Sequence, residues 1–180
     1  MRGWFPKPYA DFVQRFRVAG GFVLLVAFLG LARPTAFSFA AGVPMAALGL
    51  GLRAWAAGHL AKNERLATAG PYAWTRNPLY LGSLVAAAGL AAAARSPVLA
   101  LLFAAVFALV YLPAIEQEEW HLGKLFPDYD QYARRVPWLW PVRKPGRGAE
   151  RFRWTLYLRN REYQALAGFV AAVLVLWSRL

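Results

Sequence analysis

The polar residues best placed for chemistry fall in two blocks of an otherwise apolar chain. The first block is the stretch GPYAWTRNPLY at residues 70–80, and the second is the run Glu116-Gln117-Glu118-Glu119. Both blocks lie at the edges of long apolar runs. Guanidinium, amide and carboxylate groups at such an edge can bind the charged and hydrogen-bonding groups of a ligand. The two blocks therefore predict a polar ligand site at a membrane surface.

The carboxylates of the second block leave two interpretations open. Glu116 and Glu119 lie three residues apart, so a helix places them on one face. They can form the solvated start of a helix beyond the bilayer, where glutamates are usual. Alternatively, one carboxylate binds a cation or a pair of hydroxyl groups on a cofactor, because ionisable residues at a membrane edge are usually functional.

Two arginine–proline elements accompany these blocks. They are Arg76-Asn77-Pro78 and Arg134-Arg135-Val136-Pro137, and in each the proline restricts the direction of the chain before it. The arginines can anchor the protein to lipid phosphates. They can equally hold a carboxylate or phosphate of a ligand through two parallel hydrogen bonds.

A further group of notable residues lies within an apolar run. Gly49 and Gly51 either permit close helix packing or leave room for a planar ligand. Arg53 must pair with a carboxylate, a ligand or the membrane interface, because lipid does not solvate a charge. His59 has no second histidine or carboxylate beside it at metal-ligand spacing, so the sequence predicts no metal site. The absence of cysteine excludes disulfides and thiolate chemistry.

The elements that must position these residues are apolar helices. Apolar residues make up 59% of the 180-residue chain. A hydrocarbon core about 30 Å thick needs roughly 20 apolar residues per helix. Five apolar stretches approach or meet this length: residues 18–32, 36–60, 78–94, 97–115 and 163–177. The sequence therefore predicts an all-α, polytopic integral membrane protein of about five transmembrane helices, with a tight turn at Arg95-Ser96.

The charge pattern predicts the orientation of these helices. The net charge is +12, and 17 of the 21 lysines and arginines fall on one side of the predicted spans against 3 on the other. The positive-inside rule places the N-terminus and both chemical blocks in the cytoplasm, as in a bacterial-type inner membrane. This rule and attraction to anionic membrane lipids account for the basic charge, so no nucleic-acid partner is predicted.

Between the fourth and fifth spans the chain turns polar and forms the predicted cytoplasmic C-terminal cofactor-binding segment. Pro127-Asp128 should break a helix at 116–126 and cap a second at 128–135. An extended aromatic stretch, a linker and a basic segment should follow at 136–141, 145–148 and 151–161. Residues 4–9 are expected to lie at the membrane interface and to lead into the first span. The whole chain, 1–180, is expected to form one domain.

The two blocks together resemble a known enzyme family. The first part of the pattern is TAGPY at residues 68–72 and RNPLYLG at residues 76–82. The second part consists of Glu118-Glu119, Leu122, Phe126, Tyr129, Tyr132 and Arg135-Val136-Pro137. In order and spacing the whole pattern resembles the isoprenylcysteine carboxyl methyltransferase family, which is related to the membrane phospholipid N-methyltransferases. The resemblance covers about residues 48–141 and leaves 142–180 as a linker and an extra C-terminal helix. It implies a membrane enzyme that uses S-adenosylmethionine, and the chain lacks the G-x-G-x-x-G signature of the soluble Rossmann fold.

The resemblance also implies roles for individual residues. The cofactor pocket would be shaped by Gly70, Pro71, Tyr72, Arg76, Asn77, Pro78 and Tyr80 and closed by Glu118 and Glu119. Gly49 and Gly51 match a cofactor-binding G-x-G of the phospholipid branch. The catalytic pair would be Arg135, near the group to be methylated, and Glu119. Asn77 stands where the family usually has histidine, and Phe126-Pro127 replaces its usual Phe-Gly.

Three functions follow from these observations. The first is a membrane methyltransferase acting on a lipid-like or prenylated acceptor that carries a carboxylate or an amine. The second is a membrane reductase of related architecture that uses NADPH. The third is a non-catalytic lipid-binding membrane protein. The sequence specifies neither the acceptor nor an oligomeric state.

Overall fold

The computed structural model describes residues 5–141 and 150–180. Trp4 of the expected lead-in and the expected linker at 145–148 lie outside these residues. Every regular element in the described part of the chain is helical, which confirms the predicted all-α class. The elements are α1 (Lys7–Leu31), α2 (Ala36–Ala57), a 3₁₀ turn (Gly70–Ala73), α3 (Pro78–Ala94), α4 (Pro97–Val106), a π-helical turn (Phe107–Tyr111), α5 (Leu112–Leu125), α6 (Tyr129–Arg135), α7 (Trp154–Arg159) and α8 (Tyr163–Trp177).

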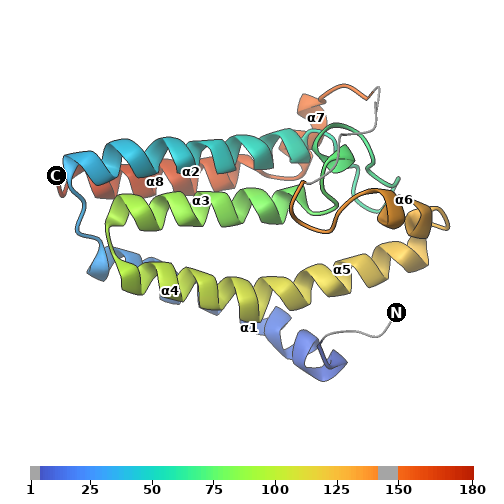
Figure 1. The fold of residues 1–180 in the computed structure, drawn as a ribbon, viewed down its shortest axis with the longest axis horizontal. Coiled ribbons are helices and arrows are strands. Elements are labelled where there is room, and N and C mark those ends of the chain that lie inside the picture. Colours follow the sequence, from blue (N-terminus) through green and yellow to red (C-terminus); the bar gives the residue numbers. More distant parts are fainter. Residues whose placement is uncertain (1–4, 142–149) are drawn as a thin grey trace.

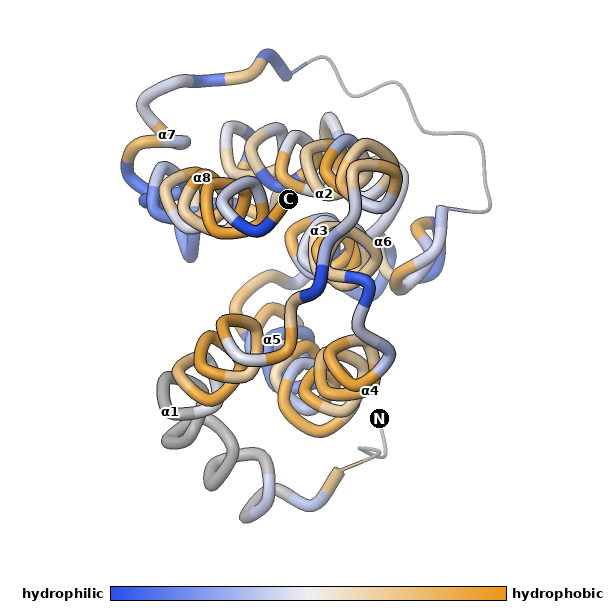
Figure 2. Tube along the Cα trace, turned by 90° about the vertical axis from the view of Figure 1, so that its left-hand side faces the viewer, coloured by the Kyte–Doolittle hydropathy of each residue, from blue (hydrophilic) through white to orange (hydrophobic). Residues whose placement is uncertain are grey.

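The long helices form two layers. Helices α2, α3 and α8 lie together in one layer, and α1, α4 and α5 lie in the other (Figures 1 and 2). The turns after α1 and α3 meet at one end, where the Arg33 amide donates to the carbonyl of Ala94 at 2.8 Å. The opposite end carries the long connection from α2 to α3 together with α6 and α7 (Figure 1). We call the latter the loop end of the bundle.

The α2–α3 interface explains two of the glycines in α2. A Cβ atom on Gly49 would lie 2.4 Å from the backbone nitrogen of Ala86, and one on Gly42 would lie 2.4 Å from that of Ala93. Both positions therefore accept only a hydrogen atom. Such close backbone approach between small residues is the usual packing device of membrane helices.

The predicted turn between the third and fourth apolar stretches is present. Arg95 ends α3 in the left-handed conformation, with φ of 51°. Ser96 then caps the next helix by accepting a hydrogen bond from the Leu99 amide, and Pro97 occupies its first turn. Serine at the cap and proline at the first position are the residues that a helix start prefers.

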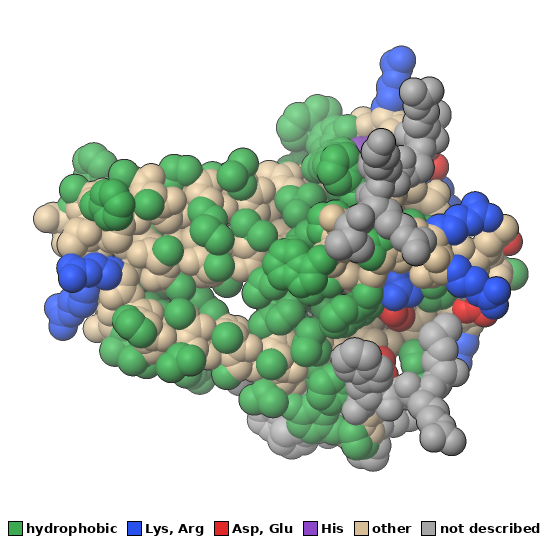
Figure 3. Space-filling model, viewed as in Figure 1, with side chains coloured by type: hydrophobic (Ala, Val, Ile, Leu, Met, Phe, Trp, Pro, Cys, Tyr) green, Lys and Arg blue, Asp and Glu red, His purple; other side chains and the backbone are tan. Residues whose placement is uncertain are grey.

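In the part of the chain that the structure describes, two helices are long and apolar enough to cross a membrane. They are Ala36–Ala57 and the continuous run Pro97–Leu125, which joins α4, the π-helical turn and α5. Three further apolar helices are shorter: Gly20–Leu31, Pro78–Ala94 and Tyr163–Trp177. Hydrophobic side chains cover the middle of the face seen in Figure 3, whereas charged side chains gather towards its ends. This surface fits a membrane protein, and the number of spans stays a prediction.

Candidate functional site

A cavity of about 770 Å³ opens at the loop end of the bundle. It is enclosed by the end of α2, the α2–α3 connection, the start of α3, α5, α6 and the turn before α8. Ligand pockets in proteins usually measure about 300–1,000 Å³, so this volume suits a ligand of cofactor size.

The predicted blocks meet in one wall of this cavity. The Asn77 amide nitrogen donates to Glu119 Oε1 at 3.1 Å and to the carbonyl of Trp138 at 3.0 Å. Arg76 Nε lies 3.4 Å from the same Glu119 oxygen, and both side chains are about one-sixth exposed, at 16% and 17%. One carboxylate thus joins the start of α3 to α5.

The second carboxylate of α5 has a partner of its own. The Tyr80 hydroxyl donates to Glu118 Oε2 at 2.9 Å. The Tyr80 ring meets the edge of the Tyr111 ring at a centroid distance of 5.8 Å. Tyr111 belongs to the π-helical turn, an irregularity that occurs frequently at functional sites. Tyr80, Tyr111 and Glu118 all line the cavity.

The segment that follows α6 fixes the loop before α3. The Arg76 amide donates to the carbonyl of Pro137 at 3.0 Å, and the Thr75 hydroxyl donates to that of Trp138 at 3.3 Å. The Tyr132 hydroxyl donates to the carbonyl of Tyr72 at 2.8 Å. The two arginine–proline elements of the sequence therefore lie against each other.

Two tyrosines of α6 add neutral hydroxyl groups to the cavity. Burial raises the pKa of Tyr129 and of Tyr132 well above the usual range, and the Glu119 carboxylate raises both further. Both phenols therefore stay protonated at physiological pH and remain able to donate hydrogen bonds.

Two buried polar atoms of the lining have no hydrogen-bond partner in the described chain. They are Arg76 Nε, which makes an ion contact with Glu119, and the Tyr129 hydroxyl, which interacts electrostatically with Glu119 and Arg76. Buried polar groups are almost always hydrogen-bonded. A buried polar atom without a partner in the protein therefore points to a partner from outside the chain, such as a ligand or a water molecule. Both residues line the cavity, so a polar ligand could satisfy both atoms.

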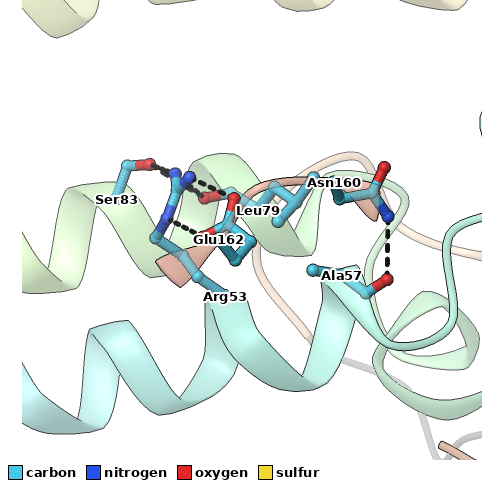
Figure 4. A network of polar contacts seen from close by, with 6 residues as sticks. All are labelled: Arg53, Ala57, Leu79, Ser83, Asn160 and Glu162. Carbon is cyan, nitrogen blue, oxygen red and sulfur yellow. Dashed lines mark hydrogen bonds and ion pairs between the residues drawn. The ribbon is translucent and has the colours of Figure 1, made fainter. Parts of the chain in front are cut away.

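A different set of charges lines the wall formed by α2, α3 and α8. Arg53 of α2 makes two contacts with Glu162, from Nε to Oε2 at 3.1 Å and from Nη2 to Oε1 at 2.6 Å (Figure 4). Its Nη1 donates to the Ser83 hydroxyl and to the carbonyl of Leu79. Arg53 thus has a carboxylate partner, one of the three partners expected from the sequence.

Asn160 continues this wall beside the ion pair. Its amide nitrogen donates to the carbonyls of Ala57 and Leu60, each at 2.9 Å. Helix ends leave carbonyls without intrahelical partners, and Asn160 binds that of Ala57 at the end of α2 together with that of Leu60 in the connection that follows. Arg53, Asn160 and Glu162 all line the cavity.

The structure brings together seven of the predicted site residues. The lining includes Tyr72, Arg76, Asn77, Pro78, Tyr80, Glu118 and Glu119. Gly70 and Pro71 lie behind the lining. A Cβ on Gly70 would lie 2.7 Å from the His59 ring, and its φ of +58° is one that glycine adopts without strain. These two residues shape the loop that carries Tyr72.

Three predicted residues lie away from the cavity lining. Gly49 packs against α3, and Gly51 faces an apolar groove on the outer side of α2 with Leu48 and Trp55. The structure therefore accounts for Gly49 by helix packing, the first of the two interpretations of this glycine pair. Arg135 is exposed at the end of α6, so its position does not support the predicted contact with an acceptor.

Several lining residues were not among the sequence-predicted site residues. They include Arg53, Tyr129, Tyr132, Asn160 and Glu162. The tyrosines were visible in the pattern that carries the family resemblance. The signal for Glu162 was its place directly before the last apolar run, combined with an arginine inside another run that needed a carboxylate. Within residues 5–141 and 150–180, no three His, Asp or Glu side chains are grouped as metal ligands.

Comparison with known proteins places most of this site within one family. Residues 37–129, just over half of the chain, match the model of the phospholipid methyltransferase family. The matched region includes Arg53, Asn77 and Glu119 but excludes Asn160 and Glu162.

Two curated relatives extend this comparison. The chain is 41% identical over 102 residues to the nickel-cobalt-cadmium resistance protein NccN of Alcaligenes xylosoxydans xylosoxydans, covering 56% of this chain and 46% of the relative. It is 36% identical over 121 residues to the cobalt-zinc-cadmium resistance protein CzcN of Cupriavidus metallidurans, covering 66% and 54%. The matches thus cover about half of each relative. No solved structure matches significantly. The extent of the family match shows that the chain belongs to the phospholipid methyltransferase family.

Proposed function

We propose that this protein is an integral membrane methyltransferase that uses S-adenosylmethionine and methylates a lipid-like or prenylated acceptor. The observation that carries the proposal is the cavity at the loop end, where the family-matched residues Asn77, Glu118 and Glu119 converge beside long apolar helices. A polar cofactor and an apolar acceptor need a site with this combination of surfaces.

The residues of the cavity fit the cofactor that the family implies. Its ribose hydroxyls, amino group and carboxylate need both acceptors and donors. Glu118 and Glu119 supply acceptors, whereas Arg76 Nε and the Tyr129 hydroxyl are buried donors without a hydrogen-bond partner among the described residues. When bound, the cofactor would supply a methyl group on a positively charged sulfur.

The protein's contribution to such a reaction is orientation and exclusion of water. Residues such as Arg76, Glu118 and Glu119 would hold the cofactor, whose methyl group would pass to an acceptor oxygen or nitrogen while the sulfur keeps the electron pair of the broken carbon–sulfur bond. An in-line displacement of this kind depends on holding the two reactants in one geometry. For an amine acceptor, Glu119 or Glu118 would accept the released proton. For a carboxylate acceptor, Arg76 or Lys62 of the lining would orient the group in place of the exposed Arg135.

We extend the proposal to the arrangement in the membrane. Five apolar helices would span the bilayer, the three shorter ones with help from flanking arginines, whose side chains reach towards the interface. The loop end would face the cytoplasm, where the cofactor is available, and the chain would act as a single domain. The printed names of the two relatives concern resistance to nickel, cobalt, zinc and cadmium, and these names do not specify an acceptor.

Binding and transfer experiments test this proposal. Calorimetry in detergent should detect binding of S-adenosylhomocysteine to the wild-type protein, and the Glu119→Ala variant should bind at least about tenfold more weakly because it loses a largely buried acceptor. Tritium from methyl-labelled S-adenosylmethionine should appear in the lipid fraction. Mass spectrometry of host lipids should then reveal species heavier by one methyl group.

The same experiments separate the alternatives. Dependence on NADPH without methyl transfer would identify a reductase. Absence of S-adenosylhomocysteine binding, with unchanged lipid binding in Glu119→Ala, would identify a non-catalytic lipid-binding protein. The exposed Glu64 lies outside the cavity lining, so Glu64→Ala is a matched control that should bind like the wild type.

A further inference from the structure

The C-terminal segment of the chain lies outside the region that matches the family, yet it closes one side of the cavity. Asn160 and Glu162 reach the lining from the turn between α7 and α8. The same segment is fixed to the end of α2 by a hydrogen bond from the Arg153 amide to the carbonyl of Gly58, at 2.9 Å. The Phe152 ring occupies the space where a side chain on Gly58 would lie. These contacts hold the C-terminal segment against the end of α2, and the Arg53–Glu162 ion pair joins the same two parts of the chain.

The arginine of this pair lies within α2 and two of its partners lie within α3, inside the helical part of the bundle. Arg53 is one helical turn before the end of α2, which corresponds to about 6 Å along the helix axis. Its partners Leu79 and Ser83 occupy the first two turns of α3 (Figure 4). This wall therefore extends from the polar loop end towards the apolar middle of the bundle, from which the polar group of a lipid would arrive.

All three guanidinium nitrogens of Arg53 are engaged. Two contact Glu162, and the third donates to Ser83 and Leu79. The side chains of Arg53 and Glu162 are 24% and 9% exposed. Because breaking a buried pair leaves an uncompensated charge, an anionic ligand would not readily displace Glu162 from Arg53. The wall is thus fixed in shape and neutral in net charge.

Tyr72 lines the same cavity as this wall and the carboxylates of α5. Burial raises the pKa of Tyr72, and the charges of Glu118 and Glu162 raise it further, while Arg53 opposes them. Both carboxylates therefore act on one buried side chain of the lining. The Arg53–Glu162 pair and the family-matched carboxylates face a common volume from different sides.

We infer that Arg53 and Glu162 form a positioning pair for the methyl acceptor. By fixing α8 against α2 and α3, the pair makes the C-terminal segment the acceptor-side wall of the cavity, opposite the cofactor-side carboxylates Glu118 and Glu119. This inference rests on the proposed methyltransferase function.

The test compares cofactor binding with acceptor use in the full-length protein. Calorimetry measures the Kd of S-adenosylhomocysteine. Tritium transfer measures KM and kcat in detergent micelles with graded amounts of phosphatidylethanolamine, an amine probe, or N-acetyl-S-farnesylcysteine, a carboxylate probe. The variants are Glu162→Gln, which keeps the side-chain shape, and the double variant Arg53→Gln/Glu162→Gln, which leaves no unpaired charge.

A second ion pair of the same segment provides the control. Arg159 pairs with Glu64 of the α2–α3 connection, but these side chains are 60% and 54% exposed. Neither residue lines the cavity. Glu64→Gln therefore removes a charge pair that also holds the C-terminal segment, without changing the wall.

We expect Glu162→Gln to raise the KM of the accepted probe about tenfold through misplacement of the wall, with the Kd of S-adenosylhomocysteine within about twofold of wild type. The double variant should recover part of this loss, and Glu64→Gln should change neither constant. An unchanged KM in Glu162→Gln, or equal losses in KM and Kd, would overturn the inference. Wild-type protein that binds no S-adenosylhomocysteine or methylates neither probe would instead reject the proposed function, and the inference with it.

Discussion

The amide of Asn77 holds two partners that come from different parts of the chain. Its nitrogen donates to Glu119 on α5 and to the carbonyl of Trp138 after α6. Asn77 is buried, so replacing it leaves an acceptor without a partner on each side. A neutral histidine has one ring N–H and can serve only one of these acceptors. The asparagine found here, where related enzymes usually have histidine, therefore has a definite structural use.

Asn77→Ala should weaken S-adenosylhomocysteine binding about tenfold and lower the free energy of unfolding by about 1–3 kcal/mol, because two buried acceptors lose their donor. Asn77→His should fall between alanine and wild type in both calorimetric affinity and thermal stability. Gln164→Ala is the control, since Gln164 is exposed and lies outside the cavity lining. Histidine performing worse than alanine would contradict this account of the site.

The hydroxyl of Tyr80 offers a smaller change in the same wall. Tyr80→Phe removes the donor to Glu118 and keeps the ring contact with Tyr111. The loss of one hydrogen bond to a charged group corresponds to about 1.5–3 kcal/mol, so S-adenosylhomocysteine affinity should fall by roughly one to two orders of magnitude. Calorimetry on Tyr80→Phe beside the exposed control Tyr163→Phe measures this. Equal affinities in the two variants would exclude a cofactor role for the Tyr80–Glu118 contact.

At the scale of elements, Gly49 and Gly51 give a direct comparison within one helix. A side chain on Gly49 would collide with the backbone of α3, whereas nothing lies within 4 Å of a Cβ on Gly51. Gly49→Ala should therefore destabilise the protein by about 1–3 kcal/mol through overpacking. Gly51→Ala should be neutral or stabilising by up to about 1 kcal/mol, because alanine favours the helix.

Thermal unfolding in detergent and S-adenosylhomocysteine calorimetry distinguish packing from cofactor binding at these glycines. If the two glycines bind the cofactor, Gly51→Ala should lose affinity while its stability is unchanged. The packing account expects full affinity in Gly51→Ala.

The sequence predicted the elements better than it predicted their contacts. The last apolar run was expected at 163–177 and is α8, and the turn at Arg95-Ser96 was readable because a serine cap and a proline follow each other. Asn77 and Glu119 were predicted for one pocket through the family resemblance. Glu162 was not, because its partner Arg53 lies 109 residues away and no local pattern encodes where α8 docks. The role of Gly49 was equally ambiguous, since small residues serve packing and ligand approach alike.

At the scale of the whole molecule, the two ends of the bundle differ in charge. The loop end carries α6, α7 and most of the charged side chains, whereas the opposite end carries few (Figure 3). This asymmetry is the structural counterpart of the sequence-based expectation that the loop end is cytoplasmic.

Single cysteines can test this orientation, because the chain has none of its own. Gln131 on α6 and Ser178 after α8 are both exposed and lie at opposite ends. Gln131→Cys should react with a membrane-impermeant maleimide in inside-out vesicles, and Ser178→Cys in right-side-out vesicles. Labelling of both from the same side would rule out the proposed five-span arrangement.

The distance in sequence between Arg53 and Glu162 also sets the order in which the protein can mature. During synthesis, α2 enters the membrane carrying an arginine whose carboxylate partner is made 109 residues later. A polypeptide interrupted before Glu162 would hold an unneutralised cation among apolar helices, which is costly and makes such products targets for quality control. Acceptor methylation should therefore begin only after the last helix has docked, so that incomplete chains never become active.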